Sequence, residues 1–93
     1  MSHGDYKAFF AAACIGDVAL AEHHLDAGVD IDFVHPELQS TALVAAIEER
    51  HEAVALLLLD RGASPTLRSP LEGMTPLEAA RAARLERVVA RLS

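Results

Sequence analysis

Aromatic residues are scarce in this 93-residue chain, which has three phenylalanines, one tyrosine and no tryptophan, or 4% in total. The bulky side chains that help to fill a β-sandwich are therefore in short supply. Apolar residues still make up 52% of the sequence, mainly as Ala, Leu and Val. A core of such side chains suits thin, closely packed helices, and the length is that of one domain.

Basic residues are also few, because eight Lys and Arg stand against fourteen Asp and Glu, which gives a formal net charge of −6. Nucleic-acid binding needs a basic face, so the composition argues against a nucleic-acid partner and against an anionic membrane surface. No apolar run approaches the length of a membrane span. The single cysteine has no partner within the chain for a disulfide.

The segment that ends at Cys14 superficially resembles a lipoprotein processing site, because small residues precede the cysteine. Its apolar run is too short for a signal sequence, and Asp5 and Lys7 give no clearly positive start. We therefore expect a cytoplasmic protein. Nothing near Cys14 in the sequence would lower its pKa, so we interpret it as a small packed residue and not a nucleophile.

The chain repeats itself with a period of 34 residues. The matched positions are Gly28 and Gly62, Pro36 and Pro70, Thr41 and Thr75, and Leu43 and Leu77. A fixed period in this range indicates a stacked repeat architecture. The sequence therefore predicts a single domain of three units, at about 1–32, 33–66 and 67–93, of which the first and last are incomplete.

Each unit is expected to hold two short helices. They are predicted at 7–15, 18–26, 52–60 and 85–92, with one more around Leu43 and Ile47 and one that starts at Thr75. Asp17 suits an N-cap, and Thr75 with Glu78 suits a capping box. Pro36 and Pro70 lie in two extended connectors. The predicted fold class is all-α, a solenoid of three helix-turn-helix repeats joined by hairpin-like connectors.

Four consecutive leucines, 56–59, occupy the second helix of the central unit. Consecutive residues point in successive directions around a helix, so these leucines cannot all face one neighbour. A helix that is apolar over most of its circumference is covered on more than one side. We therefore expect this helix to lie between its two copies, with Leu57 as a buried core residue.

The segment Thr75 to Ala80 resembles the Thr-Pro-Leu-His-x-Ala signature of the ankyrin repeat family, with Glu78 in the place of the histidine. The resemblance covers nearly the whole chain and implies an ankyrin-type solenoid whose first and last units act as caps. It also implies that His51 forms hydrogen bonds that orient the turn between helices. Arg50 departs from the family, which prefers a glycine at that turn.

Further expectations concern Arg50, the first unit and the last unit. A left-handed Arg50 would cost on the order of 1 kcal/mol, so we expect Arg50→Gly to be neutral or mildly stabilising. Phe9 and Phe10 are interpreted as an adaptation of the first unit, which lacks the leading hairpin. Four arginines in the last unit are expected to form a basic, solvated outer stripe; they are Arg81, Arg84, Arg87 and Arg91.

No catalytic site emerges from the sequence. The five glycines are scattered, so there is no phosphate-binding loop. His23 and His24 are adjacent and point to different faces of a helix, which prevents them from chelating a metal together. We therefore expect no enzyme activity, no cofactor and no metal.

What remains is an interaction surface. The resemblance implies a small adaptor or regulatory subunit that grips a protein through a concave face. By register, this predicted face comprises Cys14, Ile15, Glu37, Leu38, Ser40, Glu48, Glu49, Leu71, Glu72, Met74, Ala82 and Ala83. Its mixture of glutamates and apolar side chains suits a basic or amphipathic segment. We expect a monomer; the alternative is a structural protein that associates with itself through Phe9 or the leucine-rich helix.

Overall fold

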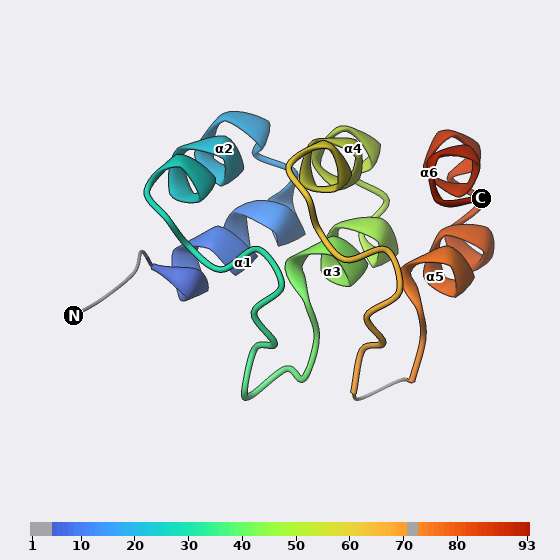
Figure 1. The fold of residues 1–93 in the computed structure, drawn as a ribbon, viewed down its shortest axis with the longest axis horizontal. Coiled ribbons are helices and arrows are strands. Elements are labelled where there is room, and N and C mark those ends of the chain that lie inside the picture. The colour runs from blue at the N-terminus through green and yellow to red at the C-terminus, as the bar shows by residue number, and fades with distance from the viewer. Residues whose placement is uncertain (1–4, 71–72) are drawn as a thin grey trace.

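The computed structural model describes residues 5–70 and 73–93, and these form six helices and no strand. The helices are α1 (Tyr6–Ile15), α2 (Val18–Asp26), α3 (Ala42–Glu48), α4 (Glu52–Asp60), α5 (Pro76–Ala83) and α6 (Glu86–Leu92). They form three consecutive pairs that stack side by side (Figure 1). The first helices of the pairs make one layer and the second helices the other, because α3 contacts α1 and α5 while α4 contacts α2 and α6. The predicted all-α stack of repeats is confirmed.

Side-chain caps set the helix starts. Asp17 accepts a hydrogen bond from the Leu20 amide at 3.0 Å, so its predicted role as N-cap is confirmed. The first helix begins one residue earlier than expected, at Tyr6, because Asp5 caps it through the Ala8 amide at 3.1 Å. These local bonds satisfy amides that have no partner within the helix.

The predicted capping box at the start of α5 is confirmed. The Thr75 hydroxyl accepts from the Glu78 amide at 3.2 Å, and the Glu78 carboxylate accepts from the Thr75 amide at 2.9 Å. The hydrogen bond from the Thr75 amide is the main cause that lowers the pKa of Glu78, and nearby Arg68 lowers it further. Both effects favour the ionised carboxylate that the cap needs.

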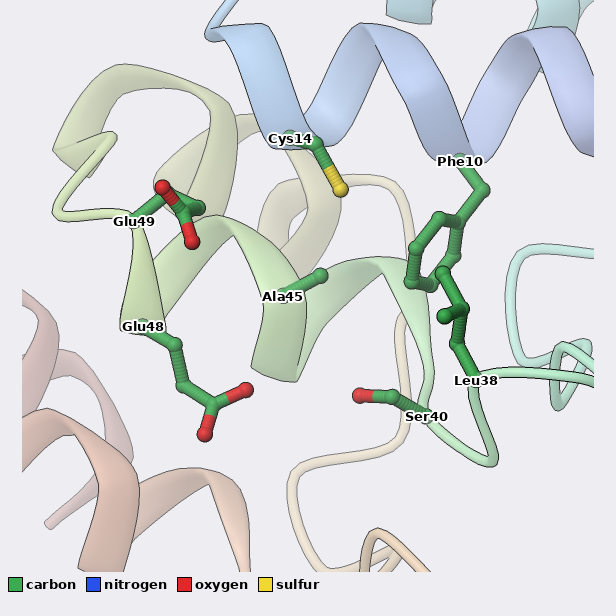
Figure 2. Close-up of a pocket in the computed structure, with 7 residues that line it drawn as sticks. All are labelled: Phe10, Cys14, Leu38, Ser40, Ala45, Glu48 and Glu49. Atoms are coloured by element: carbon green, nitrogen blue, oxygen red, sulfur yellow. The ribbon is translucent and has the colours of Figure 1, made fainter.

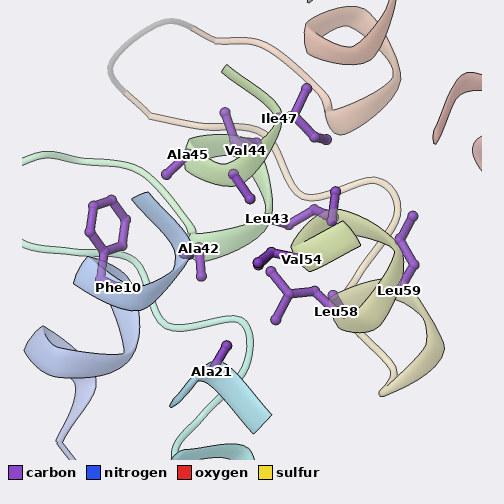
Figure 3. Packing of buried hydrophobic residues seen from close by; sticks show 14 of the residues in the cluster. Phe10, Ala21, Ala42, Leu43, Val44, Ala45, Ile47, Val54, Leu58 and Leu59 are labelled. Carbon is purple, nitrogen blue, oxygen red and sulfur yellow. The ribbon is translucent and has the colours of Figure 1, made fainter. Parts of the chain in front are cut away.

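The leucine-rich helix α4 lies between α2 and α6, as expected. Leu58 is fully buried and Leu59 nearly so, and both belong to the cluster in Figure 3. Our prediction for Leu57 is wrong, since Leu57 and Leu56 are only partly buried at the edge of this cluster. The helical phase rotates Leu58 into the interior and leaves Leu57 one step away from it.

Aromatic rings join the first unit to the first connector. Phe9 and Phe10 are both buried. The Phe10 ring lies 4.9 Å from the ring of His35, and the Tyr6 ring lies 4.2 Å from that of Phe33. The scarce aromatic residues are therefore concentrated where the first unit meets the connector that follows it.

The two connectors keep the 34-residue register in their backbone hydrogen bonds. The equivalent bonds are His35 N to Ser40 O (2.8 Å) with Ser69 N to Met74 O (2.8 Å), and Gln39 N to His35 O (2.7 Å) with Gly73 N to Ser69 O (2.6 Å). The connectors are also joined to each other, because the buried Ser69 hydroxyl donates to Gln39 O at 3.0 Å. This network joins the described parts of the two connectors below the helices (Figure 1).

All four C-terminal arginines are exposed, as expected, and two of them also form ion pairs with the central unit. Arg87 and Arg91 turn toward the central unit, where they lie 3.5 Å from Glu52 and 3.2 Å from Asp60. Partly exposed ion pairs of this kind contribute little to stability, so their main effect is to align neighbouring helices. Arg81 and Arg84 remain at the outer end of the stack.

The turns at Arg50 and Arg84 are left-handed, with φ of 63° and 58°. The Arg50 guanidinium also donates to the Ala83 carbonyl at the end of α5. For Arg50→Gly, relief of about 1 kcal/mol of backbone strain is offset by loss of a hydrogen bond worth ~0.5–1.5 kcal/mol, so we expect an almost unchanged melting temperature. Arg84→Gly removes no such bond within the described residues.

For Arg84→Gly we therefore expect stabilisation of up to about 1 kcal/mol, measured by thermal and urea unfolding. The two variants serve as controls for each other, because both replace a left-handed arginine. Equal effects would show that the bond from Arg50 to Ala83 contributes nothing in solution.

Candidate partner-binding face

A hollow of about 180 Å³ opens between α1, α3 and the first connector. We call it the α1–α3 pocket. Figure 2 shows Phe10 and Cys14 descending from α1, with the acidic side chains of α3 on the facing side. Its lining consists of Phe10, Cys14, Leu38, Ser40, Ala45, Glu48 and Glu49. Apolar and acidic side chains therefore share one recess.

Helical spacing explains why these side chains meet. Phe10 and Cys14 are four residues apart on α1, so they share a face. Ala45, Glu48 and Glu49 are spaced by three and four residues at the end of α3, which places them on one face as well. The small Ala45 side chain leaves room between the two helices, and the pocket forms there.

The buried His35 fixes the connector side of the pocket. Its Nδ1 accepts hydrogen bonds from the amides of Glu37 and Leu38, both at 3.2 Å. Its own amide donates to Ser40 O at 2.8 Å. The tip is therefore held with the Leu38 side chain 51% exposed. This positioning role was not predicted, because nothing in the sequence shows which way the His35 ring turns.

Five residues of the predicted face line this one pocket: Cys14, Leu38, Ser40, Glu48 and Glu49. Ser40 is a buried wall residue, only 7% exposed, whose hydroxyl donates to Thr41 O at 3.4 Å. Phe10 and Ala45 also line the pocket and were not predicted. The register of the repeat places a residue in its unit but cannot show which neighbouring side chains enclose a hollow.

The other predicted residues lie elsewhere. Ile15 is 68% exposed at the end of α1, and Glu37 is exposed on the connector tip. Met74, Ala82 and Ala83 belong to the third unit and do not line the pocket. The predicted residues Leu71 and Glu72 lie outside the described residues.

The pocket makes its only thiol less acidic. Partial burial is the main cause that raises the pKa of Cys14, and the charges of Glu49 and Glu48 raise it further. Both carboxylates are therefore close enough to act on the sulfur. A raised pKa disfavours the thiolate, so these surroundings oppose a role for Cys14 as a nucleophile.

Alkylation of Cys14 provides a test of this electrostatic field. Because the pKa is raised, we expect slower labelling by iodoacetamide at pH 8 than for cysteine in an unfolded peptide. Glu49→Gln should accelerate labelling, since it removes a negative charge that opposes ionisation. Glu86→Gln, far along the chain on α6, is the matched control and should leave the rate unchanged. Equal rates for all three proteins would contradict the described pocket.

The turn next to the pocket is joined to the central unit by His51. Its Nε2 donates to the Cys14 carbonyl at 2.9 Å, and its ring packs directly against Gly16. The histidine therefore acts between units: it binds the end of α1 from the start of α4. Its side chain makes no capping bond to its own helix.

Among residues 5–70 and 73–93, no group of three or more His, Cys, Asp or Glu side chains is arranged to hold a metal ion. No helix in this part of the chain is long and apolar enough to cross a membrane.

Comparison with known proteins identifies the repeat. The family model for the ankyrin repeat matches residues 39–70, which span the end of the first connector, α3, α4 and the second connector as far as residue 70. No curated protein matches the sequence. Repeats of this family bind other proteins and are typically non-enzymatic. Because the matched unit is flanked by two further helix pairs in the same 34-residue register, the chain is an ankyrin repeat protein.

Proposed function

We propose that this protein is a small, non-enzymatic adaptor or regulatory subunit that binds a partner through the face around the α1–α3 pocket. The observation that carries the proposal is the meeting of two carboxylates with exposed apolar surface in one recess. Glu48 and Glu49 favour a positive charge, while Phe10 and Leu38 favour an apolar contact. The partner segment we propose carries a lysine or arginine beside a large apolar residue.

The dimensions of the pocket agree with this partner. A hollow of about 180 Å³ is suited to one long side chain and is smaller than the usual cavities for drug-sized ligands, ~300–1,000 Å³. A lysine or arginine stem can pack against apolar atoms while its charged end reaches a carboxylate. The neighbouring apolar residue of the partner would rest on Leu38 at the rim. We also propose a cytoplasmic location, which suits a chain with one unpaired thiol.

Peptide display tests the proposal without a known partner. Selection against the wild-type protein should enrich peptides that combine a basic and an apolar residue. The variants Glu48→Lys and Glu49→Lys should weaken binding of these peptides by about tenfold or more, since like charges then meet, while the circular dichroism spectrum stays unchanged. Glu86→Lys is the matched charge reversal outside the pocket and should bind normally.

The single cysteine reports whether the pocket itself is occupied. A bound peptide should protect Cys14 from alkylation, because the thiol lines the hollow. Unchanged binding in both lysine variants, or binding without protection of Cys14, would overturn the acidic pocket as the site.

A further inference from the structure

A second hollow lies at the outer end of the stack, on the α5–α6 pair. Its volume is about 340 Å³, and it is lined by Arg81, Arg84, Glu86, Val89 and Ala90. None of these residues belongs to the α1–α3 pocket. Figure 1 shows the pair at one end of the row of helices, with no described segment beyond it.

The repeat register shows what this surface is built to contact. Equivalent positions in the earlier units are covered by the next unit: Ala13 and Ile47 match Arg81, and Ala21 and Ala55 match Val89. All four of these earlier residues are 0% exposed. Arg81 is exposed and Val89 only partly buried. The outer hollow is therefore the surface that receives a following unit elsewhere in the stack.

The opposite end of the stack shows the complementary feature. Leu20 on α2 occupies the position of Val54 and Val88, which are both 0% exposed in units that have a preceding neighbour. Leu20 itself is 37% exposed. This end therefore carries an exposed apolar side chain at a position that a preceding unit would cover.

The charges of the two ends are opposite. Residues 5–32 contain six carboxylates and one lysine, whereas residues 73–93 contain four arginines and two glutamates. At the outer end, Arg81 and Arg84 line the hollow, while the carboxylates that pair with Arg87 and Arg91 belong to the central unit. Opposite charges steer the two ends toward each other and disfavour contact between like ends.

The turns at the two ends of the stack provide a specific pair of residues for this contact, Asp17 and Arg84. Inside the stack, His51 lies directly over the turn at Gly16. In the same register, Asp17 takes the position of His51 and Arg84 takes that of Gly16. Stacking of a second copy would therefore bring the Asp17 side chain to the turn at Arg84, where its carboxylate carries the charge opposite to that of the arginine. One oxygen of Asp17 already caps α2, and a carboxylate has further acceptor sites.

An arginine at this turn is compatible with a stacked neighbour. Arg50 occupies the same position between the central and last units, where it donates to the Ala83 carbonyl of the following helix. Arg84 would reach the matching carbonyl of a second copy, that of Ile15. A contact between Arg84 and Ile15 of a second copy would thus be equivalent to the contact between Arg50 and Ala83 inside the chain.

We propose that a second copy of this chain docks head to tail, with its α1–α2 end on the outer hollow of α5–α6. The contact joins two different surfaces, so a pair of copies still has one free α1–α2 end and one free outer hollow. The contact can therefore repeat to form short open stacks. It differs from the self-association that the sequence left as an alternative, because Phe9 is buried and the fully buried Leu58 of α4 is unavailable to another copy.

Sedimentation velocity over a range of concentrations at low salt tests this contact. The wild-type protein should show a mass that rises with concentration. Arg84→Glu, on the outer hollow, and Leu20→Lys, on the opposite end, should each weaken association by about tenfold or more, because each places like charges together. Leu38→Glu, in the α1–α3 pocket, is the control and should associate as the wild type does.

Mixing the two end variants gives the decisive result. The Arg84→Glu protein keeps an intact α1–α2 end and the Leu20→Lys protein keeps an intact outer hollow, so a one-to-one complex should form from two monomeric proteins. A wild-type monomer at every concentration, association that survives both changes, or a mixture that stays monomeric would overturn the proposal.

Circular dichroism of each variant shows whether the fold is kept. Leu20→Gln replaces the lysine variant if the helical signal falls. Peptide binding to the α1–α3 pocket is measured in parallel, so that failure of the end contact is distinguished from failure of the proposed partner site.

Discussion

Leu58→Ala is expected to lower the free energy of unfolding by ~2–5 kcal/mol. Leu58 is 0% exposed, and it lies in a helix that is covered on two sides. Truncation therefore removes apolar contacts and leaves a cavity that neighbouring units cannot readily close. A domain of this size has only ~5–15 kcal/mol to lose, so this variant approaches complete unfolding.

Leu57→Ala is the matched control for this prediction. It deletes the same atoms from the adjacent position, where the side chain is only partly buried, and we expect a loss of about 1 kcal/mol. Urea unfolding followed by circular dichroism at 222 nm measures both variants. Equal losses would mean that α4 is rotated about its axis relative to the described structure.

Gly16→Ala is expected to destabilise the protein by ~1.5–3.5 kcal/mol. The φ of Gly16 is +79°, where an alanine costs ~1–2 kcal/mol. An added Cβ would also lie 2.5 Å from His51 Nδ1. The ring must then move and lose its bond to the Cys14 carbonyl, a further ~0.5–1.5 kcal/mol.

Two comparisons separate these contributions. Gly28 and Gly62 also have positive φ, but a Cβ there meets nothing within 4 Å. Alanine at either position should therefore lower the free energy of unfolding only by the cost of the left-handed backbone. In a His51→Ala background, Gly16→Ala should likewise cost only ~1–2 kcal/mol. Thermal unfolding of the four proteins of this double-mutant cycle gives the coupling energy. A coupling near zero would contradict the contact between the ring and the turn.

Periodicity was sufficient to predict the stack. The 34-residue match, the caps at Asp17 and Thr75 and the apolar spacing depend on local chemistry that one unit repeats, so helix positions followed within a residue or so. Leu57 and Leu58 show where this reasoning ends. Both are leucines in an apolar run, and only the angle at which α4 meets its neighbours decides which of them is fully buried.

The candidate site was predictable only in outline. The repeat register grouped Cys14, Glu48 and Glu49 on one predicted face, and these three residues do line one pocket. The role of His35 was not predictable, since its ring receives two amides through the particular path of the connector. The enclosure of the pocket by Phe10 likewise depends on a contact between units that sequence spacing does not specify.

The stacking of each helix pair on its neighbours also bears on how the chain folds. Each pair of helices packs mainly against the adjacent pair, so its contacts reach the neighbouring unit and do not have to join distant ends of the chain. The central pair alone has a partner on either side. We therefore expect order to spread from this pair in both directions during folding, and the two end pairs to open first as the protein is warmed.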